Sequence, residues 1–135
     1  MNTTDLAQVA QALIQAALAE ASQQNILIAA CVVDQSGHLV AHHRMAGVSY
    51  MANELVRRKA STACNFRLPT HIFYNALQQQ PTLKFAISSQ ADVLAVAGGM
   101  PIVIDGQCIG GLGIGGGSFE QDQAIAEKAM QSLNH

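Results

Sequence analysis

Hydrophobic and polar positions follow two different periods along this chain, and each period predicts a different kind of element. In residues 4–24, apolar residues recur at steps of three and four with glutamines on the opposite side, which is typical of an amphipathic helix. Thr4 or Asp5 can cap its start. Similar spacing predicts helices over 49–66, 70–79 and 118–133. The last of these begins with Ser118-x-x-Gln121, the sequence of a capping box.

A shorter period predicts the strands. Residues 26–33 are eight apolar residues without alternation, which favours a strand that is covered on both faces. Residues 38–44 alternate, so His42 and Arg44 share one face of the next strand. Residues 85–87 and 93–96 are read either as short strands or as parts of a loop. The simplest arrangement is five antiparallel strands with helices on both faces.

The clearest local signal is a hairpin near the end of the chain. Two apolar runs, residues 101–104 and 108–114, are joined by Asp105-Gly106, and Asp-Gly between such runs is among the strongest short signals for a tight β-turn. Nine of the eleven glycines lie between positions 98 and 117. Glycine inside a strand is unfavourable unless another backbone or a ligand comes close. The glycine face of this hairpin is therefore the first place to look for a site.

The same glycines also fit a nucleotide-binding pattern. Gly111, Gly113 and Gly116 match G-x-G-x-x-G after a strand and before a helix. That motif needs a following parallel strand and an acidic residue about 20 positions further on, and the sequence after it has room for one helix only. The favoured interpretation is a strand against which a neighbouring element packs closely.

Composition and charge narrow the class of protein. The 135 residues make one domain, 1–135. Half of the residues are hydrophobic and only 12% are charged, which is expected when surface is buried in an oligomer or lines an apolar ligand cavity. A net charge of −2 without a large basic cluster argues against nucleic-acid binding. Neither a signal peptide nor a membrane-spanning run is recognisable. Three cysteines at unrelated spacings indicate a cytoplasmic protein with no structural zinc or other metal site.

An ordered set of short motifs resembles one family. In order and spacing, the set is similar to the GlcG/HbpS-like family of small haem-binding domains, which includes the C-terminal domain of PduO-type corrinoid adenosyltransferases. The resemblance covers nearly the whole chain. The motifs are Val32-Val-Asp-x-x-Gly37, Arg44-Met45, Lys59-Ala-x-Thr62, Gly98-Gly99-x-Pro101, Ile109-Gly110 with Gly113 and Gly115, and Gln121-Asp122.

This resemblance implies a fold, an assembly and a class of ligand. The fold is a profilin-like three-layer α/β/α domain with a five-stranded antiparallel sheet, and the assembly is a homo-oligomer, a tetramer or an octamer. The implied ligand is haem or a corrinoid, and a smaller anionic metabolite is a further candidate. The residues of the matching motifs are then candidate ligand contacts: Arg44, Met45, Lys59, Thr62, Gly98, Gly99, Pro101, Gly113 and Gly115.

Haem requires an apolar slot, an axial ligand and cations for its propionates. The first predicted helix contains no histidine, and the candidate axial ligands are His42, His43, His71, Met45 and Tyr74. His42 is preferred, because it shares a strand face with Arg44. Arg44 and Lys59 are candidate anchors for a carboxylate, propionate or phosphate.

Three hypotheses about function remain open on the sequence. The first is a binding protein that holds its ligand in a cleft between the glycine-rich hairpin and the second helix. The second is an enzyme that acts on a small carboxylate metabolite gripped by Arg44. The third is an accessory subunit without its own ligand.

Overall fold

The computed structural model describes residues 5–134. Its elements follow the predicted order with two differences: within residues 5–134, three helices rather than two follow the first two strands, and two strands rather than about three precede the final helix. The helices are α1 (Leu6–Gln23), α2 (Tyr50–Phe66), α3 (Thr70–Leu77), α4 (Pro81–Ile87) and α5 (Phe119–Gln131), with a last 3-10 turn η2 (Ser132–Asn134); the strands are β1 (Ala29–Asp34), β2 (Leu39–Arg44), β3 (Gly99–Ile104) and β4 (Gln107–Gly115).

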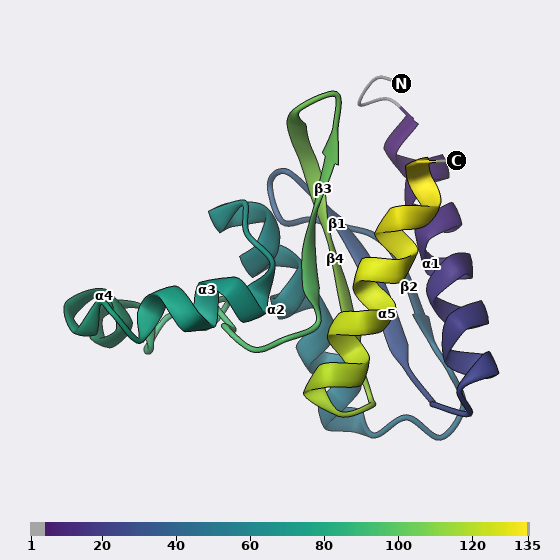
Figure 1. The fold of residues 1–135 in the computed structure, drawn as a ribbon, viewed down its shortest axis with the longest axis horizontal. Helices are drawn as coiled ribbons and strands as arrows, with labels where there is room; N and C mark the ends of the chain where they lie inside the picture. The colour runs from purple at the N-terminus through teal and green to yellow at the C-terminus, as the bar shows by residue number, and fades with distance from the viewer. Residues whose placement is uncertain (1–4, 135) are drawn as a thin grey trace.

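The strands form one antiparallel sheet in the order β2-β1-β4-β3. Helices α1 and α5 cover one face and α2 covers the other, so the sheet is the middle of three layers (Figure 1). Both central strands are covered on both faces, which explains the continuous apolar run in residues 26–33. Helices α3 and α4 extend away from these layers as an arm, to the left in Figure 1.

Within residues 5–134 the sheet has four strands, so the prediction of five is wrong. Residues 85–87 belong to α4, because Pro81 takes the first position of that helix, where its missing N–H costs nothing. Residues 93–96 form a connection without a strand. This connection is held by Thr62, whose hydroxyl donates to the Asp92 carbonyl (3.3 Å) and accepts from the Leu94 N–H (2.8 Å).

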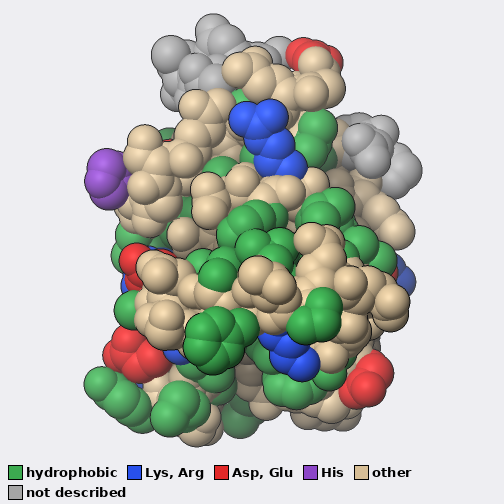
Figure 2. Space-filling view, turned by 90° about the vertical axis from the view of Figure 1, so that its left-hand side faces the viewer, with side chains coloured by type: hydrophobic (Ala, Val, Ile, Leu, Met, Phe, Trp, Pro, Cys, Tyr) green, Lys and Arg blue, Asp and Glu red, His purple; other side chains and the backbone are tan. Residues whose placement is uncertain are grey.

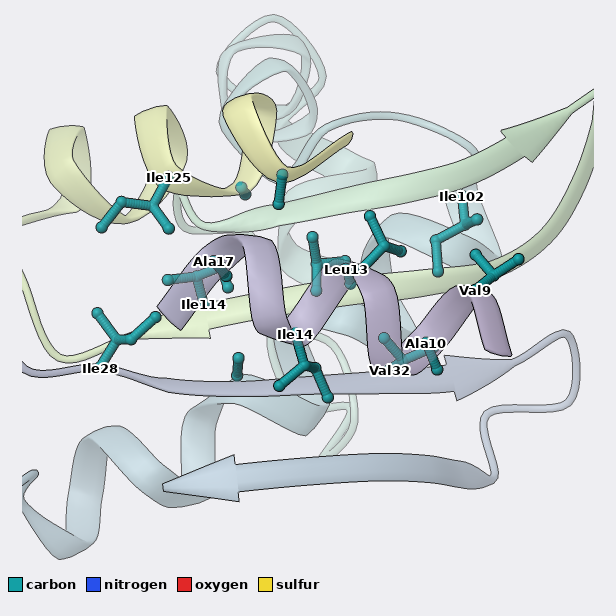
Figure 3. Packing of buried hydrophobic residues seen from close by; sticks show 14 of the residues in the cluster. Val9, Ala10, Leu13, Ile14, Ala17, Ile28, Val32, Ile102, Ile114 and Ile125 are labelled. Atoms are coloured by element: carbon teal, nitrogen blue, oxygen red, sulfur yellow. The ribbon is translucent and has the colours of Figure 1, made fainter. Parts of the chain in front are cut away.

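Two layers of buried side chains hold the sheet. The larger one lies between the sheet and the pair α1 and α5, where Leu13, Ile114 and Ile125 are fully buried (Figure 3). The smaller one lies under α2 and includes Val56 and Ala60. Small residues dominate this second layer, because the glycines of β4 bring the backbone of α2 directly onto the sheet.

Local sequence signals predicted the ends of several elements, and two of these predictions are confirmed. Asp105 and Gly106 both have positive φ (52° and 77°), which confirms the tight hairpin turn. Ser118 and Gln121 form the predicted capping box. Asp5 makes no side-chain hydrogen bond that caps α1, and Thr4 lies outside the described residues.

Candidate functional site

A buried ion pair joins both sides of the sheet at one end. Lys59 projects from α2, and its ammonium group donates to the Ile114 carbonyl (2.8 Å) and lies 3.3 Å from a carboxylate oxygen of Asp122 on α5. The two side chains are 3% and 2% exposed. The other Asp122 oxygen accepts the Gly117 N–H at 2.9 Å. The pair thus fixes α2, the end of β4 and the start of α5 in one arrangement.

Burial controls the electrostatics of this pair. Loss of solvent lowers the pKa of Lys59, although the negative charge of Asp122 and its hydrogen bond act to raise it. The same loss raises the pKa of Asp122, against the Lys59 charge and the Gly117 N–H bond. Because desolvation outweighs attraction in both groups, the pair contributes geometric definition more than stability.

Gly98 and Gly99 complete the cluster around Lys59. The Gly98 N–H donates to the Gln123 side-chain oxygen (2.7 Å), and the Gly99 N–H donates to the Thr70 hydroxyl (2.8 Å). Gly98 has φ +120°, and a side chain there would meet the Ile114 carbonyl and the Lys59 ammonium. This dipeptide therefore ties the start of β3 to α3 and α5 at the closest approach of the three elements.

A groove opens beside this cluster, between α3 and the first two turns of α5. It consists of two adjoining hollows of about 340 and 360 Å³ that share His71, Ala97, Phe119 and Glu120. Beneath it, the Lys59 ammonium lies 5.8 Å from the centre of the Phe119 ring. The remaining lining residues are Tyr74, Asn75, Val96, Gln123, Ala124 and Glu127.

The imidazole of His71 lines both hollows of this groove and can ligate a metal ion. It is the second residue of α3, held in place by the Thr70–Gly99 hydrogen bond. Its Nε2 lies 4.0 Å from a Glu127 carboxylate oxygen, its side chain is 34% exposed, and its buried Nδ1 has no hydrogen-bond partner. The sequence pattern favours His42 over His71, although Thr70-His71 directly after Pro69 marks the start of a helix, where a side chain can enter a cleft.

The structure places the predicted contacts on β2 away from this groove. His42 is exposed on the outer strand, and its Nε2 lies 2.7 Å from the Asn53 side-chain oxygen. Arg44 is also exposed on that strand. Met45 has an internal role, because its sulfur accepts the Ile28 N–H at 3.3 Å. The structure therefore separates Arg44 from Lys59, the other predicted anion anchor.

The remaining predicted contacts lie in or near the packing of α2. A side chain at Gly113 would overlap the Val56 carbonyl, and one at Gly115 would press on the Val56 side chain. This confirms the interpretation of β4 as a strand that allows a neighbouring element to approach closely. Pro101 lies on the edge strand β3 opposite Gly111. None of the nine predicted contacts lines the groove, but Lys59 and Gly98 contact the lining residues Phe119 and Gln123.

Residues 5–134 hold neither a metal-binding cluster nor a membrane-spanning helix. No group of three or more histidine, cysteine or acidic side chains is placed to hold a metal ion among them. No helix in that range combines the length and apolar character needed to cross a bilayer.

Comparison with known proteins relates this arrangement to a family. An uncharacterized 15.0 kDa protein from the dhaT-dhaS intergenic region of Citrobacter freundii is 32% identical over 126 residues, which are 93% of this chain and 89% of that protein. The corrinoid adenosyltransferase PduO of Salmonella typhimurium is 35% identical over 124 residues. These are 90% of this chain and 37% of PduO, so the chain spans little more than a third of that enzyme.

A solved structure and a family model indicate the same family as these relatives. A solved PduOC:haem complex is 32% identical with a TM-score of 0.83, covering 99% of this chain and 95% of that chain. The model of the family described as haem degrading protein HbpS-like matches residues 6–131. The chain therefore belongs to the HbpS-like family.

Proposed function

We propose that this chain is a binding protein for a planar tetrapyrrole of the haem type, held in the groove between α3 and α5. The observation that carries the proposal is His71, whose partly exposed imidazole lines both hollows of a largely apolar groove. Similarity to a haem-complexed domain over nearly the full length of both chains supports it.

The lining residues match part of what haem requires. Phe119, Tyr74 and Ala97 offer apolar surface to a flat macrocycle, and His71 can ligate its iron. No lysine or arginine lines the described groove, and Glu120 and Glu127 are acidic. The propionates would therefore point away from these carboxylates into solvent. The same acidic lining disfavours a small anionic metabolite in this groove.

A haemin titration tests the proposal through its ligand. We expect His71→Ala to weaken haemin binding at least about tenfold, roughly 1.4 kcal/mol, because the iron loses its protein ligand. His42→Ala is the matched control, because His42 is exposed and already bonded to Asn53. It also tests the alternative that His42 is the axial ligand. The Soret band is followed for the wild-type protein and both variants.

The outcomes separate the ligand from the residue. Saturable binding that His71→Ala leaves unchanged and His42→Ala weakens would contradict the groove and restore the His42 assignment. Non-saturating partition in the wild-type protein would contradict haem binding. A parallel titration with hydroxocobalamin, read from its visible bands, tests the corrinoid as the ligand.

We also propose that the chain forms a homo-oligomer through the arm made by α3 and α4. Helix α4 contains no buried residue, and Phe85 on it is 84% exposed. Hydrophobic side chains gather over the middle and lower part of the molecular face on this side (Figure 2). Burying such a surface against a second copy supplies the association energy that a protruding two-helix arm requires.

Charge on the arm should break this assembly. We expect Phe85→Asp to lower the molar mass in solution, because a carboxylate cannot be buried in an apolar contact without a partner. Multi-angle light scattering on the wild-type protein should give a multiple of 14.2 kDa. Leu39→Asp, a change at an exposed apolar residue on the other edge of the fold, should leave the mass unchanged. A wild-type protein of 14.2 kDa would contradict the proposal.

A further inference from the structure

Two of the three cysteines meet at the end of the sheet opposite to the Lys59–Asp122 pair. Cys64 lies on α2 and Cys108 near the start of β4. The Cys108 thiol lies 3.8 Å from the Cys64 carbonyl oxygen, and the Cys64 thiol lies 3.7 Å from the Asp34 carbonyl oxygen. Cys108 packs against the buried cluster that contains Cys64, and its thiol adds to burial in raising the pKa of Cys64 to about 12.

An irregularity in β4 creates this meeting. Between β3 and β4 the register changes from Ile102 opposite Gly110 to Val103 opposite Cys108. This β-bulge reverses the alternation of side chains. Cys108 therefore packs with Cys64 in the layer under α2, while its neighbour Ile109 packs in the layer under α1 and α5. Strict alternation would have placed Cys108 on the face opposite to α2.

Solvent reaches the pair through a polar hollow. Cys64 and Cys108 both line a hollow of about 500 Å³, together with Gln35, Asn65 and Arg67. Cys108 is the more exposed of the two thiols. Arg67 lies at the edge of this hollow, and its charge opposes the burial that raises the pKa of Cys64. By contrast, Cys31 is fully buried.

From this geometry we propose that Cys64 and Cys108 are a reversible dithiol–disulfide pair, a modification site for peroxides. The Cys108 sulfur attacks one peroxide oxygen, which gives a sulfenic acid and one molecule of water. The Cys64 sulfur then attacks the Cys108 sulfur, and the sulfenic oxygen leaves as a second water. The two thiols lose two protons and two electrons in total, and hydrogen peroxide is reduced to two waters. A small dithiol reverses the bond by exchange.

The bond would tie two elements that already touch. The segment between the cysteines contains α3, α4 and β3, so oxidation closes a loop that carries the whole arm. The proposal is independent of any ligand in the groove, because neither cysteine lines it.

Peptide mapping of the oxidised protein tests the proposal. The folded, reduced chain is treated with hydrogen peroxide, blocked with N-ethylmaleimide during denaturation and digested with trypsin without reductant. We expect peptide 60–67 joined to peptide 85–128, with the loss of two hydrogen masses. Titratable thiols should fall from three to one, and dithiothreitol should restore all three.

Single variants assign each sulfur. Cys31→Ser should still form the bond. Cys64→Ser and Cys64→Ala should leave Cys108 as a sulfenic acid that dimedone traps, and Cys108→Ser should leave Cys64 reduced. The proposal is overturned if the wild-type protein keeps three titratable thiols, forms only disulfides between chains, or accumulates Cys108 sulfinic acid with Cys64 free.

Discussion

Replacing Gly113 by alanine is expected to lower the free energy of unfolding by at least about 3 kcal/mol. A methyl group at this position overlaps the carbonyl oxygen of Val56 and approaches the Ala60 nitrogen to 3.0 Å. Both are main-chain atoms of α2, so no side-chain rotation relieves the overlap. Helix α2 must lift off the sheet or β4 must shift, and either movement opens the buried layer between them.

Urea denaturation followed by circular dichroism measures this loss. Gly106→Ala is the matched control. A methyl group there meets no atom within 4 Å, so the change introduces no overlap and tests only the positive φ of +77°. We expect that change to cost about 1–2 kcal/mol, from backbone strain alone. Equal losses in the two variants would mean that the contact between α2 and β4 does not require glycine.

Much of the fold could be predicted because its signals are local. Asp105-Gly106 specifies a tight turn through the conformations of two residues, and Ser118-x-x-Gln121 caps a helix through its own side chains. Residues 85–96 carry no comparable signal. A proline can end one helix or begin the next; Pro81 begins α4, and the sequence alone does not distinguish the two roles. A protruding helix without a buried residue also lacks the apolar stripe by which helices are recognised.

The candidate site was harder to predict, because it is assembled from distant segments. Alternation correctly places His42 and Arg44 on one face of a strand. It does not reveal that β2 is an edge strand, on which both side chains are exposed to solvent. Asp122 lies in the first turn of α5, where the helix dipole alone accounts for an acidic residue. Its pairing with Lys59, 63 positions earlier, depends on how three layers stack and has no signature in either segment.

Lys59→Met is expected to lower the free energy of unfolding by about 3–5 kcal/mol. Methionine fills most of the space of the lysine chain, but it leaves the buried Asp122 carboxylate without its cation. Burial already raises the pKa of Asp122 above 3.8, and losing Lys59 raises it further. The folded variant then binds a proton more tightly than the unfolded chain, so its stability is highest in acid. That stability falls as the pH rises from 3.8 through the raised pKa.

The double variant Lys59→Met/Asp122→Asn distinguishes an ion pair from simple packing. Asparagine keeps an oxygen for the Gly117 N–H (2.9 Å in the native protein) and carries no charge, so the double variant should recover most of the stability that Lys59→Met loses at neutral pH. Denaturant titrations of the four proteins at two pH values give the coupling energy between the two sites. Additive losses, unchanged by pH, would mean that the lysine acts through its hydrocarbon chain and its bond to Ile114, and that the carboxylate is neutral in the native protein.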